Sequence, residues 1–152
     1  MGKAASFETG LARRVRIKTP TVRPSLRNQQ RVDVTIDVTL ESPDGQCVVC
    51  KALNLSRAGV MLCCDKNTVQ QLIPGMRPPA PGNWIDIKTR FPIPLSTRHP
   101  ENVSADGHII HMRRVSRDEF QIGVQFCEFE GNGFDYIDKF VSKLLAEQKT
   151  GA

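Results

Sequence analysis

The fold is decided by residues 31–40, which read RVDVTIDVTL. Apolar residues alternate there with Asp and Thr, which is the period of a strand with one buried face and one face in water. A turn signal, SPDG at residues 42–45, follows directly. A second strand over about 46–54 is expected to return beside the first. The stretch therefore predicts an antiparallel β domain.

The rest of the chain repeats this pattern of short strands separated by turn residues. Four further strands are expected at about 59–64, 84–91, 104–115 and 119–128. Residues 66–74 predict a short helical turn, and the proline-rich segments 74–82 and 92–103 predict loops. Six short antiparallel strands favour a small closed barrel, because closure leaves no strand edge unpaired.

The hydrophobic period changes once, near the end of the chain. Apolar residues recur at helical spacing over about 132–148, at Phe134, Ile137, Val141, Leu144 and Leu145. We expect a C-terminal helix that packs across the barrel. The predicted organisation is a flexible basic arm (1–22), a barrel domain with its helix (23–148) and a short tail (149–152).

The positive charge is concentrated at the N-terminus. Residues 1–31 hold eight Lys or Arg and one Glu, a net charge of +7, whereas the remainder carries −2. This asymmetry indicates an arm that binds phosphate groups, either those of a nucleotide or those of nucleic acid. A solvated tail remains the alternative.

The cysteines and the apolar runs exclude several classes of protein. The pairs Cys47/Cys50 and Cys63/Cys64 lie in predicted strands, where residues one or three apart point to opposite faces. Neither pair is expected to hold a metal, and reduced thiols are favoured. No secretory signal and no apolar run of membrane-spanning length occur, which favours a cytoplasmic location. No catalytic motif or cofactor motif is found, so no enzyme is expected.

Two short motifs stand on either side of the first predicted hairpin. Arg27 and Arg31 are spaced as RxxxR just before the first strand, and Asn54, Ser56 and Gly59 form NxSxxG after the second. In this order, within six strands and a helix, the motifs resemble those of the PilZ domain. The stretches GHIIH (107–111) and FQIGVQF (120–126) are similar to the last hairpin of that family.

The resemblance implies a bacterial receptor for the second messenger cyclic di-GMP. The arginine fork of Arg27 or Arg31 suits phosphate oxygens or the guanine O6/N7 edge, and its plane stacks on purines. Asn54 either accepts from the guanine N–H edge or donates from its amide. Ser56 either donates to phosphate or holds the bend, and Gly59 allows a close approach or a special backbone shape.

Three further residues are candidates for the same site. Arg23 repeats the spacing of the arginine motif, and Arg57 lies inside the second motif, where it either reaches phosphate or is simply exposed. His111 occupies a position where some family members place an aromatic residue. It either stacks on guanine or is a surface histidine.

The expected mechanism is a switch in which ligand orders the arginine arm. The newly formed surface or the C-terminal helix then signals to a partner protein, with motility, secretion and polysaccharide production as the usual outputs of the family. Two alternatives are a nucleic-acid-binding barrel that uses the arm, and a PilZ-type interaction module without ligand.

Overall fold

A computed structural model describes residues 15–16, 26–95 and 99–151, and the side chains of 28–95 and 99–148. It confirms the six predicted strands and the C-terminal helix. The strands are β2 (Val32–Glu41), β3 (Cys47–Leu55), β4 (Gly59–Asp65), β5 (Ile85–Ile93), β6 (Glu101–Ser116) and β7 (Glu119–Phe129). The helices are α3 (Leu26–Gln29), α4 (Lys66–Leu72), the 3-10 turn η1 (Pro74–Met76) and α5 (Gly133–Gly151).

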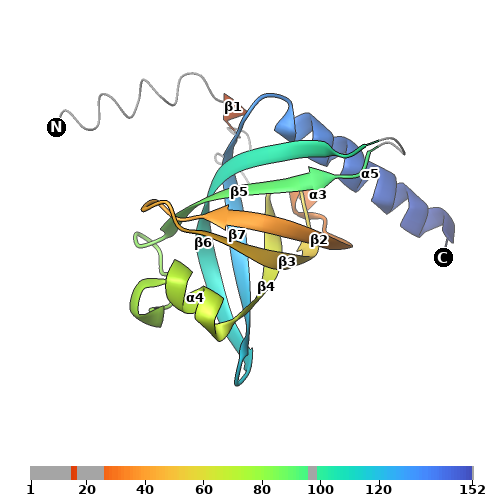
Figure 1. Cartoon of the computed structure of the whole chain (residues 1–152). Coiled ribbons are helices and arrows are strands. Elements are labelled where there is room, and N and C mark those ends of the chain that lie inside the picture. The colour runs from red at the N-terminus through yellow and green to blue at the C-terminus, as the bar shows by residue number, and fades with distance from the viewer. Residues whose placement is uncertain (1–14, 17–25, 96–98, 152) are drawn as a thin grey trace.

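The strands form one antiparallel sheet that closes on itself. Their order is β7-β4-β3-β2-β5-β6, and the additional pairing of β6 with β7 completes the barrel (Figure 1). Because every strand of the ring has two neighbours, no barrel strand presents a free edge. The expected closed six-stranded barrel is therefore confirmed.

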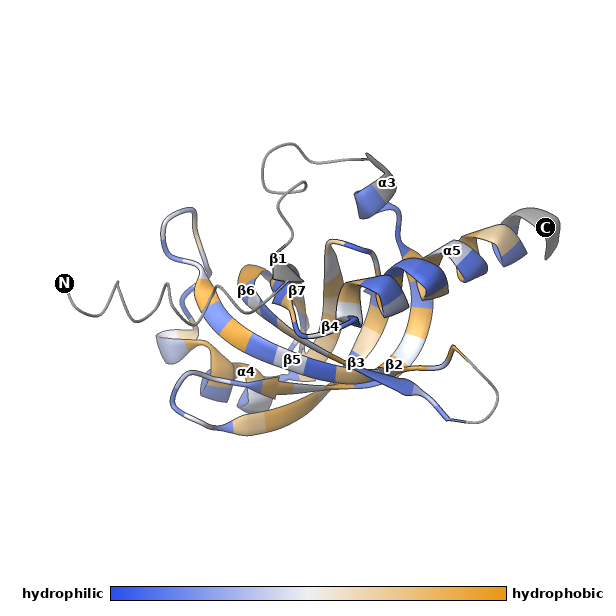
Figure 2. Cartoon of the chain, turned by 90° about the horizontal axis from the view of Figure 1, so that it is seen from above, coloured by the Kyte–Doolittle hydropathy of each residue, from blue (hydrophilic) through white to orange (hydrophobic). Residues whose placement is uncertain are grey.

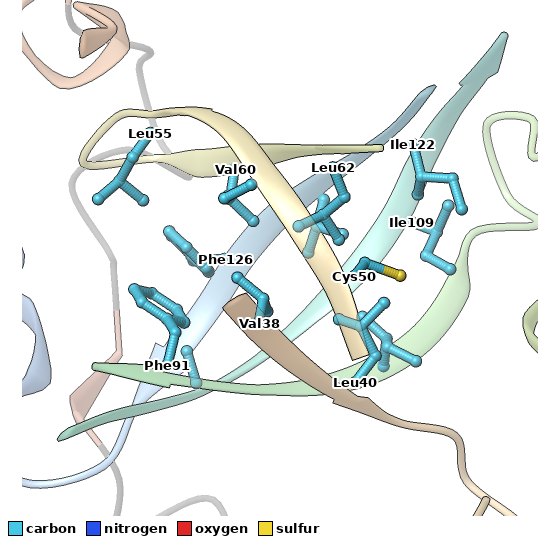
Figure 3. Close-up of a cluster of buried hydrophobic side chains, with 14 of the residues drawn as sticks. Val38, Leu40, Cys50, Leu55, Val60, Leu62, Phe91, Ile109, Ile122 and Phe126 are labelled. Atoms are coloured by element: carbon cyan, nitrogen blue, oxygen red, sulfur yellow. The ribbon is translucent and has the colours of Figure 1, made fainter. Parts of the chain in front are cut away.

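The barrel interior is filled by the apolar side chains of the alternating strands. In β2, Val38 and Leu40 are fully buried, whereas Asp37, which directly precedes Val38, is exposed. The same alternation of polar and apolar residues is visible along β5 (Figure 2). Figure 3 shows the inward side chains meeting, with Leu62, Phe126 and others from neighbouring strands in one cluster.

The two longer helices lie at different ends of the barrel (Figure 1). α5 buries Ile137, Phe140 and Val141 and contacts β2, β5 and β6. α4 packs against β4 and β7. The Asp65 carboxylate accepts a hydrogen bond from the backbone N–H of Thr68 at 2.8 Å and so caps α4.

Several elements differ from the sequence expectation. The strand β1 (Val15–Arg16) lies within the segment 1–22 that was expected to be a flexible arm, and it pairs with the end of β7. The other residues of 1–22 lie outside the described residues. α3 was not predicted, because four residues are too few to show a helical period. β5 and β6 extend into the predicted loop 92–103, and α5 continues to Gly151 rather than ending at 148.

The cysteines follow the expected alternation. Cys47 is exposed and Cys50 buried, while Cys63 is half-buried and Cys64 buried. All five cysteines are reduced. The Cys64 Sγ lies 2.7 Å from the Cys50 Sγ across β3 and β4, and this hydrogen bond together with burial raises the pKa of Cys64 far above its usual range.

Leu62→Ala should test whether this interior is the main source of stability. Leu62 is fully buried, so the variant is expected to lose about 2–5 kcal/mol of unfolding free energy in urea denaturation. Val49→Ala is the matched control on β3, because Val49 is 62% exposed, and it should lose no more than about 0.5 kcal/mol. Equal losses in the two variants would contradict the assigned core.

Candidate ligand-binding site

An irregularity in β3 turns Asn54 toward the outside of the barrel. The register of β3 against β4 shifts between Ala52 and Asn54, and its register against β2 shifts over the same stretch. As a result Ala52 and Leu55 are both buried, three positions apart, and Asn54 between them is only half-buried. Bulges commonly re-aim a side chain next to a functional site. Here the bulge presents the Asn54 amide on the outer surface.

The two sequence motifs meet at this amide. The Arg31 Nη1 donates a hydrogen bond to the Asn54 Oδ1 at 2.8 Å, and both groups lie toward solvent. Arg27 lies in α3, four residues before Arg31. Its side chain, like all of Arg23, lies outside the part of the chain whose side chains the structure describes.

The short helix α3 is fastened to the second motif through the backbone. The carbonyl of Asn28 accepts a hydrogen bond from the backbone N–H of Ala58 at 3.1 Å. The carbonyl of Ala58 in turn accepts from the N–H of Phe126 on β7 at 2.8 Å. The bend of the second motif is therefore held between α3 on one side and β7 on the other.

Ser56 forms the centre of the bend. Its hydroxyl accepts from the backbone N–H groups of Ala58 and Gly59, both at 3.1 Å, and lies 3.3 Å from the Gly59 carbonyl. The residue is 1% exposed. Of the two roles considered from the sequence, this geometry corresponds to holding the bend.

Gly59 is required by the close approach of β4 to β7. A Cβ at this position would lie 2.2 Å from the carbonyl oxygen of Val124, which is backbone and cannot move aside. Gly107 meets β7 from the other side, where a Cβ would lie 2.4 Å from the Gln125 carbonyl oxygen. β7 is thus flanked by two glycines where it passes the bend.

Arg57 lies on the opposite side of the bend from Asn54. It is only 2% exposed, so it is not the surface residue that one reading of the sequence allowed. Its Nε donates to the Asp138 Oδ1 at 2.6 Å, and its Nη2 donates to the Ser142 Oγ at 2.7 Å. Both acceptors belong to α5, so the second motif is tied to the C-terminal helix.

His111 shares the outer face with Asn54 but lies three strands away. The register runs from Asn54 to Met61 on β4, to Gly123 on β7 and to His111 on β6. At about 4.8 Å between strands, this row spans roughly 14 Å. A Cβ on Gly123 would be 3.2 Å from the His111 Cβ and 3.8 Å from the Met61 Cε. Met61 and His111 therefore border the space beside Gly123, which is open because a glycine has no side chain.

Sequence reasoning missed four of these residues. Gly123 was detectable, since an isolated glycine in a strand indicates close approach of another group. Met61, Asp138 and Ser142 carried no local signal, because their relation to the motifs arises only from barrel closure and from the docking of α5.

Other types of site are not found among the described residues. Within 15–16, 26–95 and 99–151, no three His, Cys, Asp or Glu side chains gather closely enough to bind a metal ion. The helices of those same ranges include none with the length and apolar character needed to cross a membrane.

Comparison with solved structures supports the fold. The chain is similar to the inhibitor of motility MotI/DgrA of Bacillus subtilis, with a TM-score of 0.59 and 10% identity over 79% of this chain and 50% of that one. It is also similar to MrkH of K. pneumonia in its apo state (TM-score 0.57, 15% identity, 86% and 55% covered). The MrkH–c-di-GMP complex matches with a TM-score of 0.55 and 16% identity, over 84% and 56%.

The chain spans about half the length of these solved proteins, so the likeness concerns one part of each. No curated protein matches the sequence. The family model of the PilZ domain matches residues 25–143, a range that contains both motifs, the whole barrel and most of α5. This chain belongs to the PilZ domain family.

Proposed function

We propose that the chain is a receptor for cyclic di-GMP, which binds on the outer face of the barrel beside Asn54. The observation that carries the proposal is the hydrogen bond from Arg31 to Asn54, which joins two motifs that are 23 residues apart. The MrkH–c-di-GMP complex shares the fold and supports the same ligand class.

The arginines supply the contacts to the anionic ligand. Arg31 already lies at the outer face, and Arg27 precedes it by four residues and lies in α3. Each guanidinium presents paired N–H donors that fit phosphate oxygens or the guanine O6/N7 edge. Arg23 adds a third such group in the proposal. His111, at the far end of the row, offers an imidazole face on which a base can stack.

The second motif has two different tasks in this proposal. Asn54 contacts the ligand, whereas Ser56 and Gly59 shape the bend that presents it. Ser56 uses its hydroxyl on Ala58 and Gly59, so its contribution to binding is indirect. Arg57 is directed at α5 and not at the outer face, and we assign it to signal transmission instead of phosphate binding.

Transmission follows from the contacts of the bend. Ligand bound at Arg31 and Asn54 fixes the arginine arm, which is an order–disorder type of switch. The bend that carries Asn54 also carries Arg57, and Arg57 holds Asp138 and Ser142 of α5. A change at the bend therefore alters how α5 is held, and α5 or the ordered arm presents the altered surface to a partner protein. We propose that this takes place in the bacterial cytoplasm, without catalysis.

The alternatives have less support. Binding of single-stranded nucleic acid uses exposed aromatic residues as stacking platforms. Phe120, Phe126 and Phe140 are instead buried, and Phe134 is half-buried against the core. A PilZ-type module that binds no ligand does not explain why Arg31 of the first motif is hydrogen-bonded to Asn54 of the second at the surface.

Calorimetry with cyclic di-GMP tests the proposed ligand. The wild-type chain should bind, and Arg27→Ala and Arg31→Ala should each weaken binding by about tenfold or more, since each removes charge-assisted hydrogen bonds. Arg90→Ala is the matched control, because Arg90 is an exposed arginine on β5 that faces Glu41 at 3.7 Å. It should bind like the wild type. Absence of binding by the wild-type chain would refute the proposed function.

Ser56→Ala separates a structural from a ligand-contacting role. Without any ligand, urea denaturation should show a loss of about 1–3 kcal/mol, because the buried N–H of Gly59 loses its acceptor and the N–H of Ala58 keeps only the Asn28 carbonyl. Asn54→Ala, which removes a solvent-exposed bond only, should lose no more than about 1 kcal/mol. If ligand-free stability is unchanged in Ser56→Ala, the hydroxyl is available for the ligand and the assignment fails.

Hydrogen exchange tests the transmission. Cyclic di-GMP should increase amide protection in residues 10–31 and change it in α5. In Asp138→Ala the arm should still respond, while the response of α5 is reduced, because the ion pair with Arg57 is removed and the Ser142 hydrogen bond remains. Lys139→Ala, an exposed neighbour on the same helix, should respond like the wild type. Unchanged protection of the arm in the wild-type chain would exclude the switch.

A further inference from the structure

Asp33 is the residue of β2 that lies directly across from Asn54. The register of the β2–β3 hairpin pairs the two residues. Side chains of directly opposed residues point to the same face, with Cβ atoms about 5 Å apart. Asp33 is exposed, and its neighbour Val32 is buried, so the carboxylate lies on the outer face beside the Asn54 amide.

The Asn54 oxygen already has a partner. It accepts the hydrogen bond from Arg31 at 2.8 Å, which leaves one of its two lone pairs and the amide NH₂ for a ligand. That NH₂ can only donate. A guanine base, however, presents two donors, N1–H and N2–H₂, on its Watson–Crick edge. The one remaining lone pair of Asn54 does not satisfy both donors, so an acceptor for the pair must come from another residue.

Asp33 has the chemistry and the position to be that acceptor. The two oxygens of a carboxylate can accept from N1–H and N2–H₂ together, as a bidentate, charge-assisted pair. Adenine presents an acceptor at N1 and is disfavoured by the same group. We infer that Asp33 reads the Watson–Crick edge of one guanine and sets the preference of the site for guanine. This inference rests on the proposed cyclic di-GMP function.

The other acidic side chains of β2 are placed differently. Asp37 forms an ion pair with Lys51 at 2.7 Å, and Glu41 faces Arg90 at 3.7 Å. Both therefore balance charge on the barrel surface. Asp33 instead stands across from the motif residue Asn54. Asp37 thus provides a control with the same side chain, on the same strand and the same face.

The experiment compares ligands that differ in the base edge. Calorimetry on the full chain measures binding of cyclic di-GMP, of cyclic di-IMP, whose hypoxanthine bases lack the N2 amino group, and of cyclic di-AMP. The wild-type chain should prefer cyclic di-GMP over cyclic di-IMP by about tenfold, and over cyclic di-AMP by more. Asp33→Asn should reduce the preference for cyclic di-GMP over cyclic di-IMP about tenfold, toward equal binding. Asp37→Asn should leave it unchanged.

The outcomes distinguish this inference from the function on which it rests. If the wild-type chain binds cyclic di-GMP and Asp33→Asn keeps the wild-type preference, Asp33 does not read guanine and the inference is overturned. An equal gain in affinity for all three ligands in Asp33→Asn would also overturn it, because Asp33 would then only repel phosphate. If the wild-type chain binds none of the ligands, the proposed function itself fails. Matching thermal unfolding of Asp33→Asn and Asp37→Asn shows that both variants are folded.

Discussion

The close contact between Gly59 and the backbone of Val124 is the constraint on which the site depends. No side chain fits there, since a Cβ would lie 2.2 Å from the carbonyl oxygen. The contact lets β4 pair with β7 along its whole length and fixes where the preceding bend must lie. Ala58 is then placed to bond both Asn28 and Phe126, which brings α3 against the barrel wall.

The bend separates two polar residues into two environments. Asn54 lies on the outer face, where its hydrogen bond to Arg31 remains accessible to a ligand. Arg57, three residues later, is buried under α5 with Asp138 and Ser142 as partners. A buried guanidinium needs such partners, because an unpaired charge in the protein interior is strongly unfavourable. One short segment therefore connects the ligand face with the helix face.

Much of this arrangement was predictable from the sequence, for physical reasons that are local. The period-two pattern of residues 32–40 fixed the inward face of β2, and the helical spacing from Phe134 identified α5. The resemblance to the PilZ motifs implied that Arg31 and Asn54 belong to one site. By contrast, the burial of Arg57 depends on Asp138 and Ser142, which are 81 and 85 residues away. The outward turn of Asn54 depends on a register shift against two neighbouring strands at once. Alternation within one strand does not reveal either feature.

The pairing of β4 with β7 also determines when the site can exist. β4 and β7 are distant in sequence, and contacts between distant segments carry a larger loop-closure cost and form slowly. The bonds that hold the bend need Phe126, and the glycine contact needs Val124. A chain that is still being synthesised therefore has both motifs long before it has the site. The chain can therefore bind a ligand only after the last strand has formed. Ligand binding thus indicates that the whole barrel has folded.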